Sequence, residues 1–427
     1  MSNFFRLNAH CHFVKGDDEG CIYNLLDGTM IIIKQPMVGY IEMCENNMLI
    51  KDIPEIVADF LDSLEELGLG NYYEEATYID KLSAGIPEAF EKSVPSNRKV
   101  ETVFIEIASD CNFNCIFCSE NEKVLYRRTG CKRWPLKNSI VGINEWKDVI
   151  DQVSKLSCRH IVFMGGEPLL NVDLLEELCA YIREKGINKI SIYTNGSILN
   201  DNIVMILKEY NIRLKVQLLA FSDELYEKIT GVSNIGSTVL GNMKQLVKNK
   251  INLCLSYLVL RHNENEINQA IQTYTQFVES PMEFEFVYPI PDNDYYSEKY
   301  LSTMYDQRKR LQGTGLNVHK FCDAQKQHNC YGHQIGITAD GCVLPCIMSR
   351  DFFLGDIRKN KIHEIINNKR YDFYRQLNKD KVKKCKLCAL KYGCFDCRAL
   401  EYSATGDVYG LEYCEVSRGK DLRVDAG

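Results

Sequence analysis

Between about residues 101 and 290, apolar strand patterns alternate with amphipathic helix patterns. Six strands are predicted, at 103–108, 160–164, 190–193, 214–219, 252–260 and 284–288. Repeated strand–helix units indicate a parallel sheet, because parallel strands need a crossover connection, usually a helix. We therefore predict an α/β protein whose sheet is either doubly wound or a partial barrel. Functional residues are expected at the carboxyl ends of its strands.

Length and composition narrow the class of protein further. A chain of 427 residues suggests two or three domains. The net charge of −7 and the pI of about 5.8 argue against a general nucleic-acid binder, which needs a basic surface. No apolar run approaches the ~20 residues that span a bilayer, and residues 1–15 lack the order of a signal peptide. We expect a cytoplasmic protein with no nucleic-acid or membrane partner.

Nineteen cysteines are unusual for such a chain, and without a signal peptide they favour metal or cluster ligation over disulfides. Cys111, Cys115 and Cys118 follow the first strand in a CxxxCxxC pattern. Three thiolates on one tight loop can hold three irons of a [4Fe–4S] cluster and leave the fourth iron open to a chelating molecule. The alternatives are a zinc knuckle, although structural zinc normally has four protein ligands, or buried structural cysteines.

A second motif, Gly165-Gly166-Glu167-Pro168, follows the second strand. Two glycines allow a ligand to approach the backbone closely. Glu167 offers a carboxylate to an ammonium group. The alternative is an ordinary strand-to-helix turn.

The two motifs in this order resemble the radical S-adenosylmethionine (SAM) superfamily. The resemblance implies a partial (β/α)6 TIM barrel, with Cys111, Cys115 and Cys118 as cluster ligands and SAM on the open iron. It implies reductive cleavage of SAM to a 5′-deoxyadenosyl radical, which abstracts a hydrogen atom from the substrate. For Gln217, a ribose contact and a satisfied polar group inside a strand are both open. The implied SAM-binding residues are Phe117, Gly165, Gly166, Glu167, Pro168, Thr194, Asn195 and Gln217.

Residues 313–427 hold nine cysteines and resemble the SPASM domain, which binds auxiliary iron–sulfur clusters beside radical SAM barrels. The family has three residues between its fifth and sixth cysteines, whereas this chain has two. The resemblance implies two auxiliary [4Fe–4S] clusters, three clusters in all. A zinc ribbon over 385–397 is the alternative. One ligand set is Cys330, Cys346 and Cys397, with Cys322 as the expected fourth ligand; the other is Cys385, Cys388, Cys394 and Cys414. If Cys322 does not ligate, one iron is open. The remaining eight cysteines are interpreted as core or surface thiols.

Residues 1–95 show strands followed by helices, the clearest helix covering 53–67, and residues 92–98 form a polar linker. This order fits a winged-helix-like module that captures an extended leader peptide at a sheet edge; a stabilising extension is the alternative. Residues 5–16 and Lys228–Gly231 resemble peptide maturases of the grasp-with-SPASM kind. We predict three domains: 1–95 for leader-peptide recognition, 96–312 for the radical SAM partial barrel, and 313–427 for the SPASM auxiliary clusters.

These resemblances imply an oxidoreductase that modifies a ribosomally synthesised precursor peptide, installing a thioether-type crosslink or an epimerised residue. They also imply a reducing partner such as a flavodoxin or ferredoxin. An anaerobic sulfatase-maturing, formylglycine-generating enzyme is the alternative, and it would not need the N-terminal module. The basic segment 123–133 is either a solvated loop or a lid over an acidic peptide. Glu106 and Asp340 are the candidates for a general base, and neither is chosen.

Overall fold

The computed structural model describes residues 4–51, 53–84, 99–118, 130–277, 282–291, 298–307 and 315–414. The predicted linker 92–98, both predicted domain boundaries and most of the basic segment 123–133 lie outside the described residues. The chain divides into two compact units. The first comprises Met1–Ser96, Thr314–Gly332 and Phe373–Asp396, and the second Asn97–Gly313, His333–Asp372 and Cys397–Gly427.

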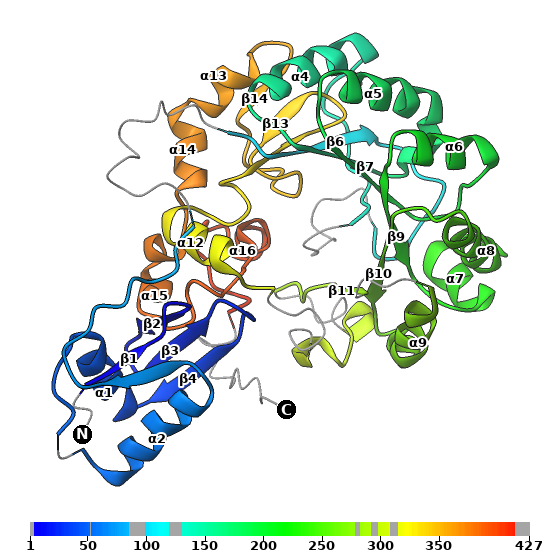
Figure 1. Ribbon diagram of the computed structural model, residues 1–427. Coiled ribbons are helices and arrows are strands. Elements are labelled where there is room, and N and C mark those ends of the chain that lie inside the picture. Colours follow the sequence, from blue (N-terminus) through cyan, green and yellow to red (C-terminus); the bar gives the residue numbers. More distant parts are fainter. Residues whose placement is uncertain are drawn as a thin grey trace. The chain divides into compact units, whose positions relative to one another are not determined.

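A nine-stranded sheet is the framework of the second unit (Figure 1). Its strand order is β11-β10-β9-β8-β7-β6-β12-β13-β14, and strands β6 to β12 pair in parallel. The sheet has two ends, so the barrel is partial, as predicted. The strands are β6 (Thr102–Ala108), β7 (His160–Gly165), β8 (Lys189–Thr194), β9 (Arg213–Leu218), β10 (Leu253–Val259), β11 (Glu283–Phe286), β12 (Gln334–Ile337), β13 (Cys342–Leu344) and β14 (Gly355–Asp356).

Helices α4 to α9 follow the strands in turn and lie along one side of them (Figure 1). In α4 the buried side chains Trp146, Val149 and Val153 recur at helical spacing and form its apolar face. Helix α7 was not expected from the sequence. The helices are α4 (Ile143–Lys155), α5 (Val172–Glu184), α6 (Asp201–Glu209), α7 (Asp223–Thr230), α8 (Ile235–Lys248) and α9 (Ile267–Phe277), with α13 (Ile362–Ile366) and α16 (Arg398–Thr405) later in the chain.

Part of the predicted cysteine-rich segment joins this sheet. Strand β12 pairs in parallel with β6, and β13 and β14 continue the sheet in antiparallel fashion. Gly336 permits this packing, because a Cβ there would lie 2.5 Å from the backbone nitrogen of Ile347. The first barrel strand therefore has neighbours on both sides, β7 and β12.

The first unit begins with the small α+β module that the sequence predicts. Strands β2, β3 and β4 form an antiparallel sheet, and β1 pairs with β5. One buried core, which includes Phe5, Ile22, Ile41 and Leu61, joins these strands to α1 and α2. The elements are β1 (Phe4–Leu7), β2 (Cys11–Lys15), β3 (Glu19–Asn24), β4 (Met30–Lys34), α1 (Met37–Glu45), α2 (Glu55–Glu66) and β5 (Gly70–Tyr73).

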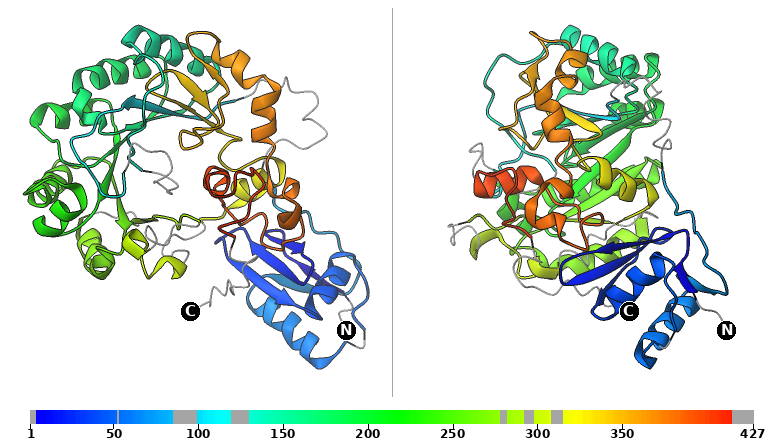
Figure 2. Two further views of the ribbon diagram at one scale, coloured as in Figure 1. Left: turned by 180° about the vertical axis from the view of Figure 1, so that it is seen from behind. Right: turned by 90° about the vertical axis from the view of Figure 1, so that its left-hand side faces the viewer.

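The rest of the first unit packs on this module. It contains α12 (Val318–Lys326), the short helix η5 (Lys379–Lys381) and α15 (Lys383–Lys386); α14 (Lys369–Arg375) begins in the second unit and ends in the first. Figure 1 and both views of Figure 2 place α15 beside the strands of the module. Within the described part of the chain, no helix combines the length and apolar character needed to cross a membrane.

Candidate functional site

The cysteine loop, residues 109–118, follows β6 and is held by backbone hydrogen bonds to a helix end. Asn114 N donates to Thr230 O at 2.9 Å, and Ile116 N donates to Ile229 O at 2.9 Å. Both carbonyls lie in the last turn of α7, where helical carbonyls lack partners within the helix. They belong to the Lys-Ile-Thr-Gly segment quoted from the sequence, whose role in holding this loop was not foreseen.

The Gly-Gly-Glu segment holds the start of the same loop from the other side. Gly166 N donates to Ala108 O at 2.9 Å, and Glu167 N donates to Asp110 O at 2.8 Å. A Cβ on Gly166 would collide with Asp110 O, and one on Gly165, where φ is +138°, would collide with Ala108 O. The two glycines are therefore required for close approach of two backbone segments.

The Glu167 side chain is fully buried and joins the ends of β7 and β8. Its oxygens accept hydrogen bonds from Leu169 N at 3.0 Å, Thr194 Oγ1 at 2.8 Å and Asn195 N at 2.8 Å. Burial raises the pKa of this carboxyl to about 7, against the lowering effect of the three donors. Three protein donors therefore satisfy the two carboxylate oxygens, and the contact of Glu167 with an ammonium group stays a prediction.

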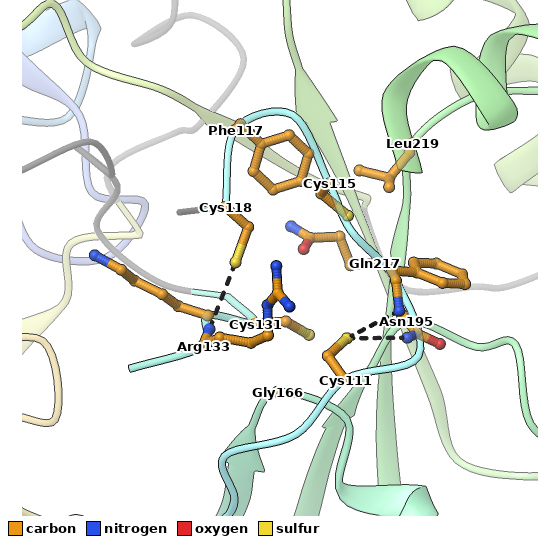
Figure 3. A pocket seen from close by; sticks show the side chains of 12 residues that line it. Cys111, Cys115, Phe117, Cys118, Cys131, Arg133, Gly166, Asn195, Gln217 and Leu219 are labelled. Carbon is orange, nitrogen blue, oxygen red and sulfur yellow. Dashed lines mark hydrogen bonds between the residues drawn. The ribbon is translucent and has the colours of Figure 1, made fainter. Parts of the chain in front are cut away.

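Three of the predicted ligands surround one pocket at the carboxyl ends of the strands. Figure 3 shows the sulfur atoms of Cys111, Cys115 and Cys118 arranged around it. The remaining lining residues are Phe113, Phe117, Cys131, Lys132, Arg133, Gly166, Asn195, Gln217 and Leu219.

Hydrogen-bond donors point at two of the sulfur atoms. Cys111 Sγ accepts from Phe113 N at 3.5 Å and from Asn195 Nδ2 at 3.8 Å, and Cys118 Sγ accepts from Arg133 N at 3.5 Å. Burial raises the pKa of the Cys111 thiol to about 11. A bound cation is therefore needed to hold it as the thiolate that ligates metal.

The donor set fits an iron–sulfur cluster better than a mononuclear metal. Among the described residues, no three His, Cys, Asp or Glu side chains converge closely enough to hold a single ion. Thiols spread around a pocket match the ligands of a larger cluster, which N–H donors to sulfur stabilise. A closed structural zinc site would need four ligands around one point.

Residues 131–133 form a rim of this pocket that the sequence did not assign to the site. The Arg133 guanidinium points toward the cysteines in Figure 3, and its Nη2 donates to Asn114 Oδ1 at 2.9 Å. Lys132 N donates to Gly165 O at 3.1 Å, which fixes the rim to the Gly-Gly-Glu segment. The only sequence signal was the basic charge of segment 123–133. In addition, Cys131 lines the pocket, although it was interpreted as a core or surface thiol.

A buried stack of cations and an aromatic ring supports the rim. The Lys132 ammonium lies 3.4 Å from the centre of the Trp134 ring, and the Arg350 guanidinium lies 4.4 Å from it. Arg350 forms a bidentate pair with Glu106, at 3.0 Å for each contact. Glu106 therefore has a structural ion partner. Asp340, the other candidate base, accepts hydrogen bonds from two backbone amides.

The structure separates the predicted SAM-binding residues into two groups. Phe117, Gly166, Asn195 and Gln217 line the pocket. Gln217 also donates to Glu285 Oε2 at 3.5 Å, so both interpretations of its role stay open. The others, Gly165, Glu167, Pro168 and Thr194, do not line the pocket.

Family models match the same stretches of chain. The Radical SAM superfamily model matches residues 105–273, and the SPASM model, described as an iron–sulfur cluster-binding domain, matches residues 330–389. This chain is a radical SAM enzyme with a SPASM domain. Iron–sulfur clusters and SAM are therefore its implied cofactors.

Relatives of the radical SAM enzyme are distant. It is 24% identical to AdoMet-dependent heme synthase of Methanosarcina barkeri, over 74% of this chain and 96% of that protein. A probable GTP 3′,8-cyclase of Methanococcus maripaludis is 26% identical over 60% of this chain and 87% of its own length. Solved structures with the same fold include Streptococcus suis SuiB bound to S-adenosylmethionine (TM-score 0.53, 14% identity, 93% of this chain and 96% of SuiB). Another is anSMEcpe with bound AdoMet and Cp18Cys peptide (TM-score 0.54, 17% identity, 74% of this chain and 94% of anSMEcpe).

The predicted auxiliary ligands of the radical SAM enzyme belong to both units, and their two ligand sets stay predictions. In the first unit, Cys322 is buried in α12, and its Sγ accepts a hydrogen bond from Ala84 N at 3.3 Å. The turn between Cys385 and Cys388 is closed by a bond from Cys388 N to Cys385 O at 3.0 Å. The first unit holds Cys322, Cys330, Cys385, Cys388 and Cys394, and the second holds Cys346, Cys397 and Cys414.

Proposed function

We propose that this enzyme is a peptide maturase that abstracts a hydrogen atom from a ribosomally made precursor peptide and carries three [4Fe–4S] clusters. The single observation that supports it best is the combination, in one chain, of a three-cysteine pocket at the strand ends with an N-terminal module whose strand β4 has one unpaired edge among the described residues. The product is a thioether-type crosslink or an epimerised residue.

Cys111, Cys115 and Cys118 would hold the SAM-binding cluster, and Cys322, Cys330, Cys346, Cys397 and Cys385, Cys388, Cys394, Cys414 the two auxiliary clusters. When bound, the first cluster supplies the electron that cleaves SAM to a 5′-deoxyadenosyl radical. The chain's own residues position SAM. Phe117 would pack near the adenine, Asn195 and Gln217 offer polar groups at the pocket wall, and the Gly166 backbone would allow the ligand to approach closely.

Arg133 completes this set of SAM contacts. SAM carries a carboxylate, and the guanidinium that points into the pocket is the matching cation. Its position is fixed by the rim contacts of Lys132 and Trp134. Glu167, by contrast, braces the strand ends that carry Gly166 and Asn195.

The precursor's leader would bind at β4. The other edge of the three-stranded sheet is covered near β2, because Leu82 N donates to Ala9 O at 2.7 Å and Leu82 O accepts from the His12 ring at 2.9 Å. Among the described residues, β4 pairs with β3 alone, so one row of its backbone groups faces outward. An extended peptide adds to such an edge through main-chain hydrogen bonds.

The fold likeness to SuiB extends over this module. The SuiB structure covers 93% of this chain, so only about 30 of the 427 residues are left unmatched. The module is much longer than that. The likeness to anSMEcpe covers 74% of the chain. The module thus favours a leader-dependent maturase over the formylglycine-generating alternative.

A proline scan of residues 31–34 tests this proposal with full-length precursor and with its core segment; Met30 is left out because its side chain packs against Gly393. Alternate residues of an edge strand direct their N–H groups outward, and proline removes the donor. We expect precursor affinity to fall at the outward positions without loss of thermal stability, and turnover of concentrated core peptide to persist. Unchanged affinity at every position would refute leader binding at β4. Product mass separates the reactions, since a crosslink removes hydrogen, epimerisation leaves mass unchanged and formylglycine formation from cysteine removes sulfur.

A further inference from the structure

The cysteine segment, residues 383–396, contacts the first strands of the N-terminal module. The Tyr23 hydroxyl, buried on β3, donates to Ala389 O at 2.7 Å. Asp17 N, in the turn between β2 and β3, donates to Leu387 O at 3.0 Å. These bonds join parts of the chain more than 360 residues apart in sequence.

Two glycines allow the surfaces to approach closely. A Cβ on Gly16 would lie 2.7 Å from Ala389 N and 2.9 Å from Leu387 O. A Cβ on Gly393 would collide with Met30 Sδ. The contact therefore leaves no room for a side chain at Gly16, where the neighbours are backbone atoms, whereas at Gly393 the Met30 side chain would have to move.

Aromatic packing extends the contact. The Phe321 ring of α12 lies 5.0 Å from the Tyr23 ring, 5.5 Å from the Tyr392 ring and 4.7 Å from the His12 ring, between centres. Tyr23 is completely buried, and burial raises its pKa well above the ordinary value, so the hydroxyl keeps its proton as a donor.

The cysteine segment has little regular structure of its own. Helix α15 has four residues and η5 has three, and such short helices are not stable by themselves. The local ion pair of Lys391 with Asp380, at 2.8 Å, and that of Lys379 with Asp396, at 2.5 Å, tie the segment to residues just before it. The long-range contacts with the module, and those of Tyr392 and Phe395 with α12, supply further constraints on its position.

We propose that the N-terminal module has a second function: it holds Cys385, Cys388 and Cys394 in position for an auxiliary cluster, with Tyr23 as a positioning residue. This inference rests on the proposed ligation of an auxiliary cluster by these cysteines. It makes the module a part of the cluster-binding apparatus as well as a peptide-binding site. Removing the module would therefore disturb both functions, and point variants are needed to separate them.

The test uses the full chain carrying Cys111→Ala, Cys115→Ala and Cys118→Ala, so that only auxiliary iron is measured. Tyr23→Phe is compared with Tyr72→Phe, which also removes a tyrosine hydroxyl from the module, but one that donates to Asp62. The readouts are the rate of iron release to a chelator and, after iron removal, the rate of alkylation at Cys388 and Cys394. We expect Tyr23→Phe to raise both rates on the order of tenfold, because a buried carbonyl loses its donor, and Tyr72→Phe to leave them unchanged.

Equal rates in the two variants would overturn the inference. Alkylation of Cys44, which is buried in the core of the module, reports whether the module still folds. If Cys44 also reacts faster in Tyr23→Phe, the same rates are measured in Gly16→Ala instead. Gly16 lies in a turn outside that core, so this variant perturbs the contact with the cysteine segment and leaves the core of the module intact. A parent protein with no auxiliary iron would contradict the proposed cluster itself, whereas auxiliary iron with equal release rates would contradict only the role of the module.

Discussion

The cysteine loop in the second unit and the cysteine segment in the first unit are held by different kinds of contact. The loop is fixed by backbone hydrogen bonds to Glu167 of the Gly-Gly-Glu segment and to the end of α7, and its three cysteines surround one pocket. The segment is fixed by a buried tyrosine, two tight glycine contacts and ion pairs. The first arrangement is part of the barrel, whereas the second depends on residues near the start of the chain.

This difference matches the two tasks proposed for the cysteines. A loop that follows a strand at the carboxyl edge of the sheet leaves a pocket open there, which suits a cluster that must bind a small molecule. A segment tied to the side chains and backbone of another module suits clusters that pass electrons and need no open face for a small molecule. Perturbations of the two regions should therefore be separable.

The largest effect is expected from Gly166→Ala, which places a methyl group against Asp110 O and should push the cysteine loop away from β7. We expect a loss of about 3 kcal/mol or more in the free energy of unfolding of the second unit, together with loss of its iron. Gly241→Ala is the matched control: the position lies inside α8 in open space, and alanine there should stabilise by about 1 kcal/mol. Denaturant unfolding measures both. A Gly166→Ala protein with normal iron and stability would break the account of the loop.

Lys379→Met should act on the cysteine segment and spare the pocket. It removes the partner of Asp396, whose side chain is 16% exposed, and leaves a largely buried charge. A cost of about 2 kcal/mol is expected, visible as faster alkylation of Cys388 and Cys394. The double variant Lys379→Met/Asp396→Leu should recover most of that loss. Equal damage in the single and double variants would show that the ion pair is not what holds the segment.

A change of pH should affect the barrel through His160. Burial, assisted by Lys189 and Arg213, lowers the pKa of this ring from 6.5 to about 4 in the folded protein. The folded state then binds fewer protons than the unfolded state between these values, so stability is full above pH 6.5 and falls as the pH drops toward 4. Between pH 7 and pH 5 we expect a loss of at most about 2 kcal/mol.

His160→Gln should flatten this pH dependence while keeping a hydrogen bond to Ser191, which lies 2.8 Å from the His160 ring. Urea unfolding at the two pH values measures the effect. His160 lies in neither cysteine region. The alkylation rate of the cysteine segment should therefore be the same in the His160→Gln variant and in the parent protein. Identical dependence of stability on pH in the variant and the parent would show that His160 does not cause the loss of stability at low pH.

The smallest effect is expected from Asn195→Ala, which deletes one donor to Cys111 Sγ, a bond of 2.9 Å to Asn112 Oδ1 and two local bonds accepted from Ser197. The loss should be about 1 kcal/mol in stability. The reduction potential of the SAM-binding cluster should also fall, because fewer N–H groups face its sulfur ligand. Asn249→Ala removes an exposed bond to Gln245 O and serves as the control. An unchanged potential would show that Asn195 does not act on the cluster.

The sequence predicted the barrel and the cysteine loop because both depend on short-range patterns. Strand and helix periodicity identified the six parallel strands, and the spacing of Cys111, Cys115 and Cys118 identified the loop. A ligand contact for Glu167 stays a prediction, since a carboxylate that can meet a ligand can equally accept three protein donors. Residue type does not distinguish the two.

Long-range contacts could not be predicted in this way. Nothing near Tyr23 in the sequence indicates a partner at Ala389, and nothing near Arg350 indicates that it pairs with Glu106 beside the pocket. The sequence showed Arg133 only as one member of a basic run. Its place beside the cysteine loop results from tertiary packing, which the sequence pattern does not indicate.

The most direct test is the content of iron and labile sulfide per chain after anaerobic purification, with and without Cys111→Ala, Cys115→Ala and Cys118→Ala. The account predicts about twelve irons in the parent protein and about eight in the variant, since each cubane cluster holds about four. About four irons in the parent, with zinc also bound, would assign the C-terminal cysteines a structural role and contradict the account.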